Sequence, residues 1–366
     1  MIMNDLPNIG PITLNRLLQE LGGDPREILR TPKRRLESVR GVGPETSDAL
    51  VNWRTHFDLA REEERLAQAN AVFITTGDEG YPKLLKEIHD PPIGLYRKGG
   101  YLFDRPNIAV VGSRRTTLYG QAIAKKLGSD LARLGFCVVS GLARGIDTAA
   151  HEGALAAGGK TAAVLGCGLD IIYPPENYDL YRRIAETGAV LSEFPFGRKA
   201  DKQTFPMRNR VVAGMCEAIV VVESDVSGGA MITARFAGEQ GRLIFAVPGR
   251  IDQPSSAGCH QLIRDGATLF TSVDDILNEL NYLDGLRPQA IAAPAGTPSV
   301  LEQLLPQLSA DERRVFECFA GGSLLSVDAL VAATALGAPQ VSAALMMLEL
   351  KKLVMKRSDG AFEARS

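Results

Sequence analysis

Six short apolar runs alternate with helical patterns through the middle of the chain, and this alternation limits the possible folds more than any other feature. The runs cover residues 108–112, 137–141, 161–166, 189–193, 218–223 and 243–249. Strands this apolar are covered on both faces, as in a parallel sheet. The spacing therefore predicts a doubly wound, Rossmann-like α/β core, in which ligands bind at the carboxyl ends of the strands.

Segments of a different character flank this core. Residues 1–66 contain two similar pieces, each with a Gly-Pro pair before an amphipathic helix, as in a SAM-like or helix-hairpin-helix domain. Residues 285–300 are rich in Ala, Pro and Gly, which indicates a linker between the core, 67–284, and a tail, 301–366. Three helical patterns and then a hairpin pattern predict that the tail is a winged helix.

The roles of both flanking domains stay open. The turns of residues 1–66 offer N–H groups to a DNA phosphate, or the helices only pack. The run Lys33, Arg34, Arg35 adds cations, although such a run is more often a solvated face. The third helix of the tail is mostly Ala, Leu and Met, with Lys351 and Lys352 at its end. That composition favours packing or partner docking over reading duplex DNA.

Composition excludes several classes of protein. The formal net charge is −2, so a nucleic-acid site must be a local basic patch. The five cysteines are dispersed without a C-x-x-C pair, which argues against a zinc site or a disulfide framework and fits the cytoplasm. The N-terminus lacks a secretory signal pattern, and no apolar run approaches the roughly 18 residues of a membrane span.

The loop after the first apolar run, VVGSRR, is a candidate phosphate site. Gly112 permits close approach of a phosphate, Ser113 offers a hydroxyl, and Arg114 and Arg115 offer two guanidiniums. A helix from about Leu118 adds its N-terminal dipole. The alternative is a purely structural glycine turn.

A local basic patch occupies residues 196–214. Its cations outnumber the one acid, Asp201, and are Arg198, Lys199, Lys202, Arg208 and Arg210. Phe205 lies among them. Cations that follow a backbone and a ring that stacks a base are typical of single-strand binding. The alternative is a solvated loop with Phe205 in the core.

Two more glycine turns follow strands. One spans residues 140–145, and the other is Ser227-Gly228-Gly229, which suits a phosphate or a close backbone approach. After the first turn, we interpret Asp147 as a helix cap and His151 as a packing residue.

The sequence shows no catalytic arrangement. Glu193 and Glu223 end strands near the expected site, but a lone carboxylate does not indicate catalysis. No G-x-x-x-x-G-K-[ST] loop occurs, and no nucleophile and base stand out as a pair. We therefore expect neither an enzyme nor a bound cofactor or metal.

The core resembles the DNA-processing protein A family, DprA or Smf, over about residues 70–284. The motifs, in order, are VVGSRRTTLYG, SGLARGIDTAAHEGAL, YPPENYDL, LSEFPFG, FPMRNRVVAG, SGGAMITA and AVPGR. The resemblance implies a homodimer without catalytic turnover that binds incoming single-stranded DNA during natural transformation. It also implies that the protein shields this strand from nucleases and helps load RecA onto it.

By position, the resemblance implies a DNA pocket built from four segments. The Gly-Ser-Arg loop corresponds to Gly112, Ser113, Arg114 and Arg115, and a lysine and an aromatic three residues apart correspond to Lys202 and Phe205. The Pro-x-Arg-Asn-Arg element contributes Arg208, Asn209 and Arg210, and the small-residue turn contributes Ser227 and Gly228. One departure is Gly229, where a serine is commoner.

Two other functions compete with single-strand binding. The core is also similar to Rossmann-like phosphoribohydrolases that split nucleoside monophosphates, but their P-G-G-x-G-T-x-x-E glutamate is missing here. A winged-helix regulator that reads duplex DNA is the other alternative, and its weak point is the apolar third helix.

Overall fold

The computed structural model describes residues 1–280, 308–319, 325–351, 353–356 and 362–364. The chain divides into two compact units, Met1–Ala293 and Pro294–Ser366. The predicted linker at 285–300 lies outside the described residues, and the expected domain boundaries stay predictions.

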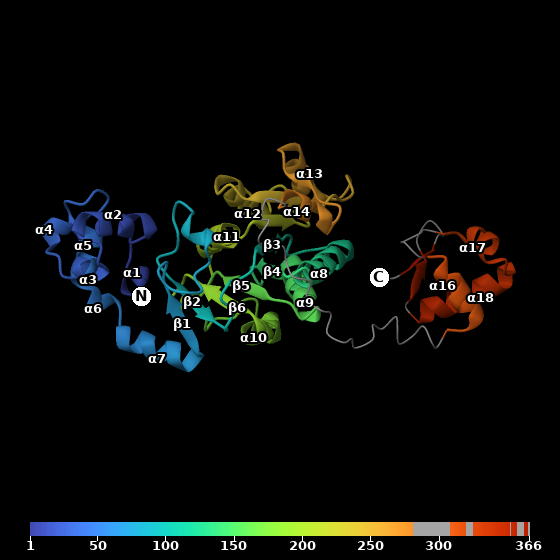
Figure 1. The fold of residues 1–366 in the computed structure, drawn as a ribbon, viewed down its shortest axis with the longest axis horizontal. Helices are drawn as coiled ribbons and strands as arrows, with labels where there is room; N and C mark the ends of the chain where they lie inside the picture. Colours follow the sequence, from blue (N-terminus) through green and yellow to red (C-terminus); the bar gives the residue numbers. More distant parts are fainter. Residues whose placement is uncertain (281–307, 320–324, 352, 357–361, 365–366) are drawn as a thin grey trace. The chain divides into compact units, whose positions relative to one another are not determined.

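Within the described residues, a nine-stranded sheet forms the centre of the first unit (Figure 1), in the order β1-β2-β6-β5-β4-β3-β7-β8-β9. The strands are β1 Ala71–Ile74, β2 Leu95–Lys98, β3 Asn107–Val111, β4 Cys137–Ser140, β5 Thr161–Leu165, β6 Ala189–Ser192, β7 Ala218–Val221, β8 Leu243–Ala246 and β9 Thr268–Leu269. All pairings from β6 to β9 are parallel, whereas β2 runs antiparallel to β1 and β6. All six strands expected from the apolar runs are present, so the doubly wound core is confirmed.

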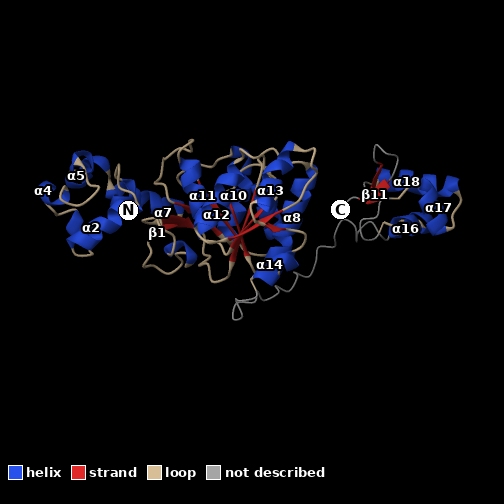
Figure 2. Cartoon of the chain, turned by 90° about the horizontal axis from the view of Figure 1, so that it is seen from above, coloured by secondary structure: helices blue, strands red, loops and turns tan. Residues whose placement is uncertain are grey.

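Helices cover both faces of this sheet (Figure 2). One face carries α8 Leu118–Arg133, α9 Ile146–Ala156 and α14 Val273–Glu279, and the other carries α11 Thr204–Gly214, α12 Gly229–Glu239 and α13 Pro254–Arg264. The alternation along β3 shows why both faces are apolar. Ile108 and Val110 pack with the first group of helices, and Ala109 and Val111 pack with the second. Near β5 and β6, α7 Leu59–Ala69 and α10 Tyr178–Thr187 complete the cover.

The N-terminal helices repeat one unit. The helices are α1 Ile2–Asp5, α2 Pro11–Leu21, α3 Pro25–Ile28, α4 Lys33–Leu36, α5 Pro44–Val51 and α6 Trp53–His56. Gly10 before α2 and Gly43 before α5 are both extended, with ψ of 175° and 178°, and each precedes a proline that opens the helix. The repeat that the sequence showed is therefore also a repeat of backbone conformation.

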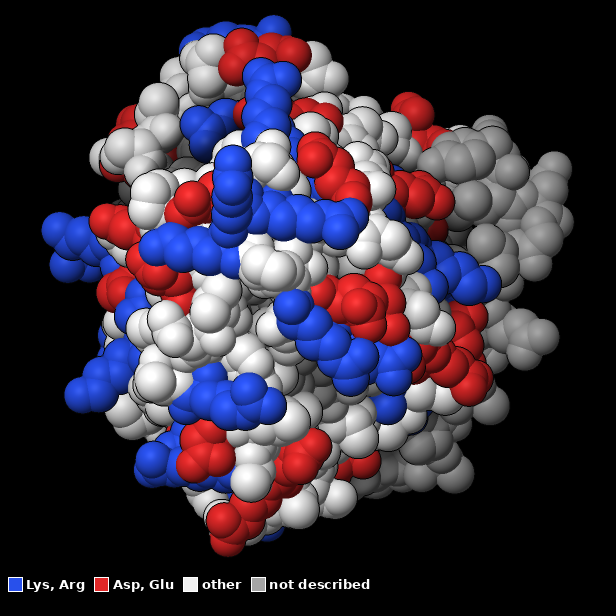
Figure 3. Space-filling view, turned by 90° about the vertical axis from the view of Figure 1, so that its left-hand side faces the viewer, with Lys and Arg blue, Asp and Glu red and all other residues white. Residues whose placement is uncertain are grey.

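Charges on these N-terminal helices are mixed. Lys33 pairs with Asp48, with 2.5 Å between Nζ and Oδ1, and Arg30 pairs with Glu27 at 3.0 Å. On the face shown in Figure 3, basic and acidic side chains are interspersed. This supports the interpretation of the run at 33–35 as a solvated face.

The second unit has the predicted winged-helix order. It contains α16 Ala310–Glu317, α17 Val327–Thr334, α18 Ala338–Leu350 and the antiparallel strands β10 Val354–Lys356 and β11 Phe362–Ala364. Buried Val341, Leu345 and Leu348 hold α18 in the core of this unit. Lys351 pairs with Glu312 at 2.8 Å. The predicted Ser-Asp-Gly turn lies outside the described residues.

None of the described helices is by itself long and apolar enough to cross a membrane. Together, α17 and α18 reach the required length and apolar content, but the chain bends by 111° between them.

Candidate nucleic-acid interface

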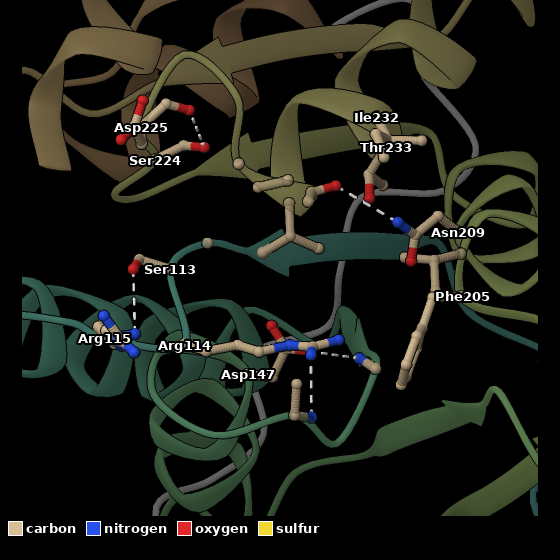
Figure 4. A pocket seen from close by; sticks show the side chains of 18 of the residues that line it. Ser113, Arg114, Arg115, Asp147, Phe205, Asn209, Ser224, Asp225, Ile232 and Thr233 are labelled. Carbon is tan, nitrogen blue, oxygen red and sulfur yellow. Dashed lines mark hydrogen bonds between the residues drawn. The ribbon is translucent and has the colours of Figure 1, made fainter. Parts of the chain in front are cut away.

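A cavity of about 630 Å³ opens at the carboxyl ends of β3, β4 and β7 (Figure 4). The loops after these strands and the first turns of α11, α12 and α13 line it. The predicted site residues that line the cavity are Gly112, Ser113, Arg114, Arg115, Phe205, Arg208, Asn209 and Gly228. Three predicted residues are not part of the lining: Lys202, Arg210 and Ser227.

The loop after β3 is held in place by Glu223 at the end of β7. The Ser113 N–H donates to the Glu223 carbonyl oxygen at 2.6 Å. The Glu223 carboxylate accepts hydrogen bonds from the hydroxyls of Thr116 and Thr117, at 2.7 and 2.5 Å, and from the Thr117 N–H at 2.9 Å. Glu223 therefore positions the loop. Ser113 Oγ accepts a bond from the Arg115 N–H at 3.1 Å, which leaves the hydroxyl proton free to donate to a ligand.

Arg114 and Arg115 are exposed at the mouth of the cavity. Among the described residues, neither has a carboxylate within 4.0 Å of its guanidinium. The guanidinium of Arg114 lies over the ring of Phe205, with 4.6 Å between the guanidinium carbon and the ring centroid. Figure 4 shows Arg114 extended from the β3 loop and Phe205 descending from α11 on the same side of the cavity. Both cations thus line one cavity without a carboxylate partner in the described part of the chain, and Arg114 also contacts an aromatic ring.

Small residues and a helix start form the opposite wall. Gly228, Gly229 and Ala230 line the cavity, and Gly228 precedes α12 without a side-chain cap. This 11-residue helix therefore begins at the cavity wall, and helix starts are common binding places for anions. The Asn209 side-chain amide donates to the Gly229 carbonyl oxygen at 3.3 Å and joins α11 to this wall.

Arg208 lines the cavity although its side chain is buried. It is 5% exposed, and its Nη1 donates to the carbonyl oxygens of Gly141 and, at 2.8 Å, of Val164. A Cβ on Gly141 would lie 1.8 Å from this Nη1, so a side chain at position 141 would displace the guanidinium. Burial lowers the pKa of Arg208, and the nearby Asp147 carboxylate opposes this shift. Arg208 thus ties the ends of β4 and β5 to α11.

Asp147 is not the helix cap that the sequence predicted. Gly145 occupies the cap position of α9, and the Asp147 carboxylate turns back to accept the N–H groups of Gly141 at 3.0 Å and Ala143 at 3.2 Å. Burial raises the pKa of Asp147, while Arg208 and these hydrogen bonds lower it. The carboxylate therefore shapes the turn at 140–145.

The structure places Arg210 outside the cavity that most of the predicted DNA-contacting residues line. Its side chain is 6% exposed, forms an ion pair with Glu193, and donates to the Asp90 carbonyl oxygen at 2.8 Å. The physical reason is helical geometry, because α11 already begins at Thr204 and residues two apart differ by about 200° around a helix. Arg208 faces the cavity, so Arg210 faces away. Lys202 is exposed before α11, outside the lining.

His151 is a packing residue, as expected. Its Nδ1 lies 2.6 Å from Thr161 Oγ1, whose own proton goes to the Val138 carbonyl oxygen at 2.6 Å. The Thr161 hydroxyl therefore accepts from His151, and Nδ1 carries the proton. Complete burial lowers the pKa of His151 to about 3, which keeps the ring neutral.

Sequence reasoning missed several lining residues, namely Ser224, Asp225, Pro254 and Ser255. Ser224 and Asp225 lie in the loop after β7, so the rule that ligands bind at the carboxyl ends of parallel strands could have found them. The other two open α13 with a proline at its start, which was also visible in the sequence. Among the described residues, no group of three or more His, Cys, Asp or Glu side chains could hold a metal ion.

Comparison with known proteins places this fold in one family. The sequence-family model of DNA recombination-mediator protein A matches residues 72–281, and the family model of the DprA winged helix domain matches residues 299–360. The protein Smf of Synechocystis is 32% identical over 99% of this chain and 97% of its own length. The chain belongs to the DNA recombination-mediator protein A family. The family resemblance found in the sequence is thereby confirmed.

Solved structures of family members share the fold. The X-ray structure of DNA processing protein A from Streptococcus pneumoniae superposes with a TM-score of 0.66 at 34% identity, over 76% of this chain and 95% of that one. The Helicobacter pylori protein, described for its unique single-stranded DNA binding mode, gives 0.53 at 32% identity, over 58% of this chain and 98% of its own. This family member therefore has the core of a recombination mediator.

Proposed function

We propose that this family member binds single-stranded DNA in the cavity at the carboxyl ends of β3, β4 and β7 and delivers it to RecA during natural transformation. One observation carries the proposal. Two guanidiniums without a carboxylate partner among the described residues, those of Arg114 and Arg115, line an open cavity, and that of Arg114 lies over the aromatic ring of Phe205. Cations hold the phosphates of an unpaired strand, and the ring stacks a base.

The remaining contacts follow from the same geometry. The α12 helix start and the Ser113 hydroxyl supply neutral donors to phosphate oxygens. The single-strand binding described for the Helicobacter pylori relative supports this assignment. Homodimerisation and a cytoplasmic location stay predictions, which rest on the family resemblance and on the dispersed cysteines.

Fluorescence anisotropy with a labelled oligonucleotide tests the proposal. We expect tighter binding of single-stranded than of double-stranded DNA, with a salt slope of roughly 0.7 log units for each phosphate neutralised. Arg114→Ala should weaken binding and lower that slope by about one phosphate. Phe205→Ala should lose roughly 1–3 kcal/mol of binding free energy.

Arg183→Ala is the matched control, because Arg183 is an exposed arginine on α10 that does not line the cavity. Its affinity and salt slope should equal those of the wild type. Equal binding of single and double strands, or an Arg114→Ala variant that binds like the wild type, would exclude the cavity as the DNA site.

Delivery to the recombinase needs its own assay. RecA nucleation on a single strand should be faster in the presence of this protein, and Arg114→Ala should remove the acceleration. If the protein binds single strands but slows RecA nucleation, it protects the strand without delivering it to RecA.

We propose no catalytic turnover. The two buried carboxylates nearest the loops, Asp147 and Glu223, are both bonded to backbone and hydroxyl donors, so neither is available as a base. Release of free base from a nucleoside monophosphate would contradict this and support the phosphoribohydrolase alternative. A duplex-reading role of the winged helix lacks support, since Lys351 is paired with Glu312 and the third helix is apolar.

A further inference from the structure

A second aromatic side chain lies beside Phe205. Tyr173 belongs to the YPPEN motif, in the loop between β5 and the 3₁₀ turn Pro175–Asn177. The ring centroids of Tyr173 and Phe205 are 5.9 Å apart, and the ring planes are inclined by 50°. Tyr173 is 39% exposed, whereas Tyr181, which follows in the same part of the chain, is 4% exposed. Packing of the core therefore does not account for the position of Tyr173.

The two rings share a groove. A narrow hollow next to the main cavity is lined by Tyr173, Gly166, Cys167 and Ala200, together with residues of the main cavity, including Arg114 and Phe205. Both hollows have Arg114 and Phe205 in their walls, so they adjoin at these two side chains, and we call the two together the groove. The walls of the groove come from the carboxyl ends of β7, β3, β4 and β5, which lie side by side in this order in the sheet.

The distance between the two rings determines on which of their faces a base can stack. A base between two parallel rings needs about 7 Å between them, twice the contact distance of roughly 3.5 Å. The measured 5.9 Å between the centroids of Tyr173 and Phe205 is too short, so a base stacks on an outer face of either ring. The guanidinium of Arg114 covers one face of Phe205 at 4.6 Å. A base that takes this face displaces the guanidinium, which is then free to bind the adjoining phosphate.

We infer that Tyr173 is a second base-stacking residue, so that neighbouring bases of one strand stack on Phe205 and on Tyr173. The inference rests on the proposed single-strand binding and adds a subsite for a further nucleobase at the β5 end of the groove. The phosphate between the two bases lies next to Arg114, which is in the walls of both hollows.

Photo-crosslinking of the wild-type protein provides the direct test. Oligothymidylates that carry one 5-iodouracil, placed at each position in turn, crosslink to an aromatic side chain that stacks on the iodinated base. We expect crosslinked peptides containing Phe205 from one position and Tyr173 from a neighbouring one. Crosslinks at Phe205 without any at Tyr173 would overturn the inference and leave the proposed function intact. Absence of single-strand binding itself would overturn the proposed function.

Affinities of variants provide a second test. Tyr173→Ala should weaken binding of a long oligothymidylate by roughly 5- to 150-fold, which corresponds to the stacking of one base. Tyr173→Phe should bind like the wild type, because the ring remains. The control is Tyr178→Ala, since Tyr178 is 52% exposed on α10 and lies outside the groove lining.

Oligonucleotide length separates stacking from structural support of Phe205. For oligothymidylates shortened until only the Phe205 crosslink remains, Tyr173→Ala should bind as tightly as the wild type. An equal loss at all lengths would show that Tyr173 only supports Phe205 and would overturn the inference.

Discussion

Replacing Arg210 by methionine would remove the counter-charge of a buried carboxylate. Arg210 and Glu193 are 6% and 9% exposed, and Oε2 of Glu193 has no hydrogen-bond partner in the described structure. The charge of Glu193 is therefore balanced by Arg210, with Asp90 bonded to the other side of the guanidinium. Removing one partner of a buried pair costs about 3–5 kcal/mol. We expect Arg210→Met to lose that much free energy of unfolding.

The double variant isolates the charge effect. In Arg210→Met combined with Glu193→Gln, no unpaired charge stays buried, so the loss should shrink to about 1–2 kcal/mol. Both losses are measured by urea unfolding followed by circular dichroism. A double variant that loses the sum of the two single losses would show that the ion pair is not what stabilises this region.

The pH dependence has a definite sign. Burial raises the pKa of Glu193 and Arg210 opposes this, so Arg210→Met should raise the pKa further. A carboxyl group whose folded-state pKa is raised binds a proton more readily in the folded state, and its stabilisation is lost as pH rises. The loss caused by Arg210→Met should therefore be smaller at pH 5 than at pH 8.

Single-strand binding distinguishes this structural role from DNA contact. Folded Arg210→Met should bind DNA with wild-type affinity and salt slope, unlike Arg114→Ala. An unchanged urea midpoint, together with weaker binding and a slope lowered by roughly 0.7, would refute the assignment and restore Arg210 as a phosphate contact.

Three further predictions concern the same sheet edge. The folded-state pKa of His151 is about 3, against 6.5 in the unfolded chain, so the wild type should lose about 2 kcal/mol of stability between pH 7 and pH 5. His151→Gln should lack this part of the loss in urea titrations at both pH values. Glu223→Gln turns an amide N–H₂ toward the donors of the β3 loop. Hydrogen exchange at the Thr117 amide should therefore accelerate, and single-strand affinity should fall. Unchanged exchange would argue against Glu223 as the residue that holds this loop. In Gly112→Ala the new Cβ would meet Ile146 Cγ1 at 2.6 Å, so thermal unfolding should show a loss of about 1–3 kcal/mol, and an unchanged melting temperature would contradict this.

Local patterns in the sequence were sufficient for the core and for half of the site. Apolar runs predict buried strands because a strand covered on both faces has no polar side to display. Once the strands are parallel, their carboxyl ends share one edge, and the residues that follow them are brought together. Arg114 and Arg115 follow β3 directly, which is why the sequence alone located them at the cavity.

Tertiary structure decided which cations of the basic patch at residues 196–214 face the cavity. The sequence placed Arg208 and Arg210 in one patch, but the start of α11 at Thr204 turns them to opposite sides of the helix. The counter-charge of Arg210 comes from Glu193 at the end of β6, and no local pattern links it to α11. Likewise, Tyr173 reaches Phe205 because α11 packs against the end of β5, the strand that precedes Tyr173. Charge composition is a property of the chain, whereas burial and pairing depend on which distant segments the fold brings into contact.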